Sequence, residues 1–166
     1  MLYYFNSFIL YSTIGFWFES FIFKFTNVCK HSGIFYGPIT GVYGVGAVFL
    51  ILIYKYVFKK LKVNKYVKPI IMYVICVVFL SLIEFTLGNI LNILFDIDMW
   101  NYSSHKIHFG KYVCLVNSLV WGLFGVLFIY YIKDFFDRFL GKVSKKSSYI
   151  LLSIFIIDSV FVLLTR

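Results

Sequence analysis

The stretch PIIMYVICVVFLSLIEFTLGNILNILF, from Pro69 to Phe95, decides the class of fold. Its residues are mostly large and apolar, and Glu84 is the one charged side chain among them. A helix rises about 1.5 Å per residue, so about 20 such residues cross the hydrocarbon core of a bilayer. The length of the stretch and its near absence of charge therefore predict a transmembrane helix.

Four further apolar stretches occupy most of the remaining chain, at residues 2–25, 37–58, 113–136 and 149–164. The first three are long enough to span a bilayer, and the last is near the lower limit, so it either spans or lies in the interface. Only 14% of the residues are charged, against about 25% in soluble domains. We therefore predict an all-α integral membrane protein of about five transmembrane helices, folded as one polytopic membrane domain over residues 1–166.

The formal net charge of +9 follows the predicted topology. Most basic residues lie around the second and fourth connections between the apolar stretches, which fall on one side of an alternating topology. They are Lys55, Lys59, Lys60, Lys62, Lys65, Lys68, Lys133, Arg138, Lys142, Lys145 and Lys146. Because positive charge marks the cytoplasmic side, we expect a cytoplasmic N-terminus and, with five spans, a C-terminus outside. Membrane lipid is the expected partner of these residues, and no nucleic-acid binding is expected.

The sequence contains one candidate internal repeat. Residues 33–58 align with residues 111–136 at an offset of 78, with 6 of 26 positions identical. The helix predicted before each segment carries one glutamate, Glu19 in the first case and Glu84 in the second. Small or polar residues share a helical face with each glutamate. The pattern predicts a duplicated helical hairpin.

The repeat divides the predicted membrane domain into two tandem hairpins, about 1–58 and 69–136, followed by a fifth helix at about 149–164. Both hairpins would start on the same side of the membrane, which makes a parallel repeat related by an axis along the membrane normal. Small residues let helix backbones approach closely in lipid. The glycines expected at such contacts are Gly37, Gly41, Gly44, Gly88, Gly122 and Gly125. We expect the second helix to start around Gly37, with Pro38 in its first turn.

The glutamates within the predicted spans are the sharpest candidates for function. An ionised carboxylate in hydrocarbon costs at least about 2.5 kcal/mol, so it usually faces the bundle interior, a partner or a water-filled cavity. If the repeat axis relates the hairpins, Glu19 and Glu84 could line one central site that binds a cation, hydrogen-bonds a polar ligand or relays protons. Alternatively, each glutamate only staples helices together. The polar neighbours expected in either case are Asn92, Asn117 and Ser118, and Asn89 is a further partner if the glutamates only staple helices.

The longest outer connection, about residues 96–112, is rich in aromatic and polar side chains. Its candidates are Trp100, Asn101, Tyr102, His105 and His108, and Tyr36 stands at the equivalent place before the second helix. Trp and Tyr at this depth are expected as interfacial anchors, and a binding lid is the alternative. No cysteine or carboxylate stands at ligand spacing beside the histidines, so we expect no metal and no cofactor.

Five motifs occur in an order that resembles a known bacterial family. They are YSTIGFWFE (Tyr11–Glu19), GIFYGPITGVYG (Gly33–Gly44), WNYS (Trp100–Ser103), GKYVCL (Gly110–Leu115) and SLVWG (Ser118–Gly122). Over roughly residues 8–135 they resemble the ABC-transporter permeases of the CmpB-like, or type IV, group. That family often has W-D-Y-S and G-R where this chain has Asn101 and Lys111. The resemblance implies a multi-spanning protein of the bacterial plasma membrane that serves as part of a transporter.

Three functions from different classes remain open. The first is a transporter or permease component of unknown substrate, of the ABC type by resemblance. The chain has no G-x-x-x-x-G-K-[ST] loop, so an ATPase would be a separate subunit. The second is a non-catalytic accessory or scaffold protein, and the third is a lipid-acting membrane enzyme with Glu84 or Glu19 as acid or base. No catalytic constellation supports an enzyme, so we favour the first. Five helices enclose little room, and we expect a homo-oligomer or a partner.

Overall fold

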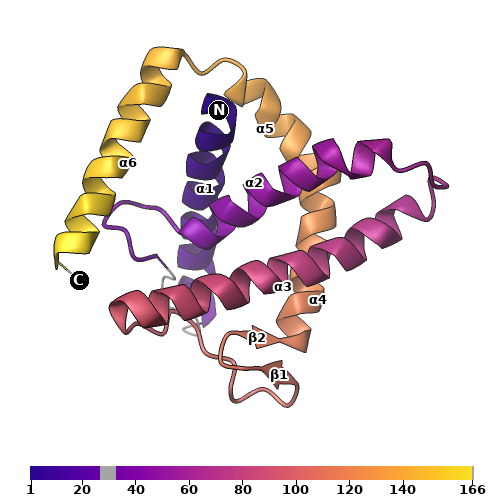
Figure 1. The fold of residues 1–166 in the computed structure, drawn as a ribbon, viewed down its shortest axis with the longest axis horizontal. Helices are drawn as coiled ribbons and strands as arrows, with labels where there is room; N and C mark the ends of the chain where they lie inside the picture. The colour runs from indigo at the N-terminus through magenta and orange to yellow at the C-terminus, as the bar shows by residue number, and fades with distance from the viewer. Residues whose placement is uncertain (27–32, 166) are drawn as a thin grey trace. The chain divides into compact units, whose positions relative to one another are not determined.

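The computed structural model describes residues 1–26 and 33–165 and is mostly helical (Figure 1). Its long helices are α1 (Leu2–Thr26), α2 (Gly41–Tyr56), α3 (Lys68–Phe95), α4 (Leu115–Leu127) and α6 (Lys145–Thr165). A 3-10 turn at Phe58–Lys60 follows α2, and a π-helical segment at Phe128–Ile132 joins α4 to α5 (Lys133–Leu140). Two short strands, β1 (His108–Phe109) and β2 (Val113–Cys114), pair antiparallel between α3 and α4.

Four helical stretches in the described residues are long and apolar enough to cross a membrane. They are Gly41–Lys60, Lys68–Phe95, Leu115–Leu140 and Lys145–Thr165. The last has 21 residues and a mean hydropathy of 2.2, which favours spanning over an interfacial position. Large apolar side chains are exposed along α3, α4 and α6, as expected of surfaces that lipid covers. The chain is therefore an all-α membrane protein, as predicted from the sequence.

Helix α1 differs from the four candidate spans in composition. It has 25 residues, enough to cross a bilayer, but several polar residues and the charged Glu19 and Lys24 interrupt its apolar sequence. That α1 crosses the membrane as a fifth span stays a prediction.

The chain divides into two compact units. One comprises residues 1–45 and 136–166, and the other comprises residues 46–135. The boundary falls within α2 and α5, so each of these helices contributes to both units. Each unit is described by itself.

In the first unit, α1 packs against α6. The buried side chain of Asn6 donates a hydrogen bond from Nδ2 to the hydroxyl of Ser148, at 2.8 Å. Phe5 and Phe8 of α1 both make edge contacts with the ring of Phe155 on α6. Polar and aromatic contacts thus join the two ends of the chain.

The start of α2 corrects one prediction from the sequence. The helix begins at Gly41, four residues later than expected, so Gly37 and Pro38 lie outside it. The backbone N–H groups of Tyr36 and Gly37 each donate to the carboxylate of Asp158 on α6, both at 3.0 Å. The N–H of Ile39 donates to the carbonyl of Gly37 at 2.7 Å, which closes a three-residue turn instead of a helical turn. Asp158 thus anchors a segment that turns before α2 begins.

In the second unit, α3 and α4 pack closely against each other. A Cβ added to Gly122 would overlap Val77 of α3, and one added to Gly125 would lie 2.6 Å from the sulfur of Cys76. Glycine at these two positions lets the helix backbones approach to a distance that any larger residue would prevent.

The α3–α4 connection, residues 96–114, folds back along α3 instead of extending away from it. Asp96 adopts a left-handed conformation with φ 52°, and this reverses the chain where α3 ends. The ring of Phe109 then packs on Phe85 at 5.4 Å, and Tyr112 packs on Gly88. One face of the last turns of α3 is therefore covered by the connection.

Candidate functional site: the Glu84 carboxylate

Glu84 lies on α3 with only 5% of its surface exposed. One carboxylate oxygen, Oε1, accepts two hydrogen bonds. The hydroxyl of Tyr102 in the α3–α4 connection donates to it at 3.0 Å, and the indole N–H of Trp121 on α4 donates at 3.3 Å. The carboxylate thus joins three segments of the second unit.

The other oxygen of Glu84, Oε2, is buried and has no hydrogen-bond partner among the described residues. The ion pairs found in that part of the chain join Lys111 to Asp98 and Lys133 to Asp134, and neither involves Glu84. A buried carboxylate without a partner on one oxygen is costly unless a proton or a bound group satisfies it. Oε2 is therefore the atom of this carboxylate that still lacks a partner among the described residues.

Further polar side chains surround this carboxylate. The hydroxyl of Ser81, one turn before Glu84, donates to the buried hydroxyl of Ser118 at 2.7 Å, and Asn117 hydrogen-bonds the hydroxyl of Tyr102. Burial and then the adjacent Glu84 raise the pKa of Tyr102, so its hydroxyl remains a donor at neutral pH. The site offers hydroxyl, amide and indole groups around one carboxylate.

The depth of the site follows from α4. Trp121 is six residues beyond the start of that helix, which corresponds to about 9 Å along its axis. Glu84 is also within reach of Tyr102, which belongs to the connection. Glu84 itself is 11 residues before the last residue of α3, which corresponds to about 16 Å along that helix. The carboxylate therefore lies in the middle third of α3, and the folded-back connection reaches it there through Tyr102.

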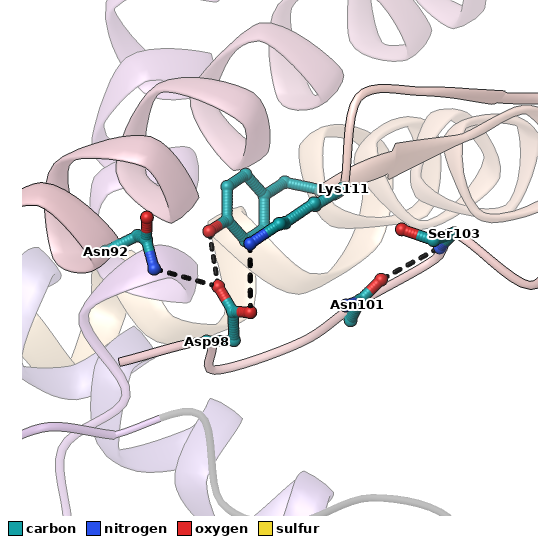
Figure 2. A network of polar contacts seen from close by, with 6 residues as sticks. Asn92, Asp98, Asn101, Ser103 and Lys111 are labelled. Carbon is teal, nitrogen blue, oxygen red and sulfur yellow. Dashed lines mark hydrogen bonds and ion pairs between the residues drawn. The ribbon is translucent and has the colours of Figure 1, made fainter. Parts of the chain in front are cut away.

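A second polar network holds the connection in this folded-back position (Figure 2). Asp98 accepts hydrogen bonds from Asn92 of α3 at 3.1 Å and from the hydroxyl of Tyr112 at 2.5 Å, and it forms an ion pair with Lys111 at 3.4 Å. The Tyr112 hydrogen bond holds the pKa of Asp98 below its usual value. Burial, followed by Asp98, raises the pKa of Tyr112 to about 12.

Backbone contacts then position Tyr102. Its N–H donates to the carbonyl of Lys111 at 2.7 Å, and the indole N–H of Trp100 donates to the carbonyl of Tyr112 at 3.1 Å. The side chain of Asn101 accepts a hydrogen bond from the N–H of Ser103 at 2.9 Å (Figure 2). Trp100 and Asn101 thus shape the turn that directs Tyr102 toward Glu84.

The structure brings together only some of the residues singled out from the sequence. Tyr102, Asn117 and Ser118 lie at or beside Glu84, whereas Asn92 bonds Asp98 and belongs to the second network. Asn89 donates to a carbonyl of its own helix.

The remaining candidates lie elsewhere. His105 and His108 are exposed, with the His105 ring 5.5 Å from that of Tyr102. Glu19 is on α1, in the first unit, and Tyr36 bonds Asp158 in that unit and Thr165 at the end of α6.

Sequence reasoning missed Trp121 as a partner of Glu84. The helical spacing held a signal for it, because Trp121 lies one turn beyond Asn117 and Ser118 on the same side of α4. No pattern in the sequence indicated the role of Tyr112, because that role depends on the connection folding back over Gly88.

Bilayer-length helices around a buried carboxylate with polar neighbours define an integral membrane protein with a polar site between its helices. Residues 6–164 match the family described as "Putative ABC-transporter type IV", and the chain belongs to that family. This confirms the resemblance seen in the motifs and extends it through α6. No curated protein and no solved structure matches the chain.

Proposed function

We propose that the protein is a membrane-embedded transporter component and that Glu84, with Tyr102 and Trp121, forms the polar site where its substrate is recognised. Membership of the family supports the transporter role. The observation that carries the site is the unpartnered Oε2 of a carboxylate that is 5% exposed. A residue that only joined helices would gain by bonding both oxygens, because an unsatisfied buried acceptor costs about 1–3 kcal/mol.

Matched helix packing supports the duplicated hairpins. In the first hairpin, a Cβ on Gly44 of α2 would overlap Phe8 and Ser12 of α1. In the second, a Cβ on Gly122 of α4 would overlap Val77 and crowd Tyr73 of α3. Gly122 is 78 positions after Gly44, and Tyr73 and Val77 are each 65 positions after Phe8 and Ser12. In both hairpins, the glycine of the second helix therefore packs against equivalent positions of the first helix.

The same register relates the two glutamates. Glu19 also lies 65 positions before Glu84, and Tyr43 lies 78 positions before Trp121. Glu19 is then the counterpart of Glu84 in the first hairpin, and Tyr43 is the counterpart of Trp121. We therefore propose Glu19 as a second candidate for substrate recognition, within the first unit.

The topology and partners follow from charge and family. The lysines after α2 and those around α5 and α6 lie in the cytoplasm of a bacterial cell, next to anionic lipid of the plasma membrane. An ATPase encoded separately supplies ATP hydrolysis, and a second copy of the chain or another membrane subunit completes the pathway.

Native mass spectrometry of the full chain, purified in mild detergent, tests this function. We expect the wild type to carry a discrete small molecule or an ATPase subunit, and we expect Glu84→Gln to lose the small molecule while remaining folded. Asp134→Asn is the matched control, because it removes one exposed carboxylate from the same unit.

Two other outcomes would favour a different function. A folded, ligand-free wild type bound to an unrelated membrane partner would overturn the proposal and favour an accessory protein. Turnover of a lipid that is lost in Glu84→Gln would favour a membrane enzyme.

A further inference from the structure

The charge of Glu84 has no counter-ion in the described part of its unit, and this limits what can bind there. Its ionised form buries one negative charge, which the neutral hydroxyl of Tyr102 and the neutral indole of Trp121 stabilise only in part. An anionic ligand would add repulsion, and a neutral ligand would leave the charge uncompensated. A proton or a cation on Oε2 removes the imbalance.

Oxygen groups that can bind a cation are also present on this helix pair. Ser81 is one turn before Glu84 on α3, and its hydroxyl bonds the buried hydroxyl of Ser118 on α4.

We infer that the Glu84 site binds a small monovalent cation, inorganic or a primary ammonium, in exchange for a proton on Oε2. This rests on the proposed function, in which Glu84 recognises the substrate. When the cation binds, the Oε2–H bond breaks and the proton passes to water. When the cation leaves, a proton from water restores the neutral acid. The charge of the site is the same in both states, so one cation replaces one proton.

Few other groups near Glu84 could release that proton. The connection contributes Tyr102, whose ring meets the exposed His105, and β2 contributes the buried thiol of Cys114 near Tyr102. His105 is therefore the competing proton source that the experiment has to exclude. The neighbouring helices contribute uncharged groups. These are Ser81 of α3, Asn117, Ser118 and Trp121 of α4, and Phe49 of α2, which packs on Phe79 of α3.

Proton release from the purified full chain tests the exchange. The protein is held in weakly buffered detergent with a pH indicator, and sodium, potassium or methylammonium chloride is added. We expect about one proton released per chain with at least one of these salts. Because proton and cation compete for one oxygen, the half-saturating salt concentration should rise up to about tenfold for each unit by which the pH is lowered.

Three variants identify the source of the proton. Glu84→Gln should release none, and His105→Gln should release as much as the wild type. Glu84→Asp keeps a carboxylate one methylene shorter and should release the proton at a higher salt concentration, which keeps the test valid if Glu84→Gln does not fold. Release that survives in Glu84→Gln, or that disappears in His105→Gln, would overturn the inference.

The experiment separates this inference from the proposed function. A bound neutral or anionic molecule that depends on Glu84, without proton release by any of the three salts, would overturn the exchange and leave the recognition site standing. Absence of both a Glu84-dependent ligand and proton release would overturn both.

Discussion

Replacing Gly88 by alanine should detach the α3–α4 connection from α3. A Cβ at this position would lie 2.5 Å from Cγ, 2.8 Å from Cδ1 and 2.9 Å from Cβ of Tyr112, whereas ordinary contact begins at 3.4 Å. These atoms are at the base of the tyrosine side chain, so rotation of the ring cannot relieve the overlap. Tyr112 is also held at both ends, through its carbonyl by Trp100 and through its hydroxyl by Asp98.

The free-energy cost of the substitution follows from this lack of freedom in Tyr112. Overpacking of a well-packed interior costs about 1–3 kcal/mol, which is a factor of about 5–150 in the equilibrium between the closed and detached connection. The loss should appear as faster amide hydrogen exchange across residues 96–114 and as a lower midpoint of thermal unfolding in detergent. Tyr102 leaves Glu84 when the connection detaches, so proton release by added salt should change as well.

Gly41→Ala is the matched control. A Cβ there would lie 3.6 Å from its nearest neighbour, a ring carbon of Phe35, which is ordinary contact. We expect little change in the unfolding midpoint and none in exchange across the connection. Equal behaviour of Gly88→Ala and Gly41→Ala would refute the argument that the connection packs on α3 through glycine.

Three further predictions concern the polar contacts. The raised pKa of Tyr112, about 12 against an ordinary value of about 10, means that its stabilising effect is complete below pH about 10 and is lost as the pH rises through 12. Tyrosinate absorbance should therefore include a component that titrates near pH 12 and that Tyr112→Phe removes, and an unchanged titration would contradict the Tyr112–Asp98 contact. Asp158→Ala removes the acceptor of the Tyr36 and Gly37 amides, which water can partly replace because these bonds are exposed or half-buried. We therefore expect a loss of about 0.5–1.5 kcal/mol in stability and faster exchange across residues 33–40. Exchange as slow as in the wild type would count against this anchor. Asn6→Ala removes a buried bond between helices and should cost about 0.6 kcal/mol in a thermal or denaturant titration, whereas Ser153→Ala, whose exposed hydroxyl bonds its own helix, should cost less.

The spans were predictable because lipid imposes a simple requirement on sequence. A helix that crosses hydrocarbon needs a continuous apolar run, and the run from Pro69 to Phe95 became α3, Lys68–Phe95, with a difference of one residue. Length and hydropathy decide such elements locally. The conformation of the segment before α2 was not predictable in this way, because its amides bond Asp158, which lies more than 100 residues further along the chain.

The site was only partly predictable for a related reason. Helical spacing correctly puts Glu84 and Asn92 along one stripe of α3, but it does not say what will cover that stripe. The α3–α4 connection covers this stripe. Asn92 therefore bonds Asp98 and Glu84 bonds Tyr102, both of which belong to the connection. The reversal at Asp96 and the two-residue strands that create this cover have no apolar pattern to reveal them.

The state of the Glu84 carboxyl group tests the site most directly, and isotope-edited infrared spectroscopy measures it in the purified full chain. We expect one carboxyl band that is absent in Glu84→Gln and that shifts in both Tyr102→Phe and Trp121→Phe, because each side chain donates to Oε1. A Glu84 band that keeps its frequency in both phenylalanine variants would contradict the site described here.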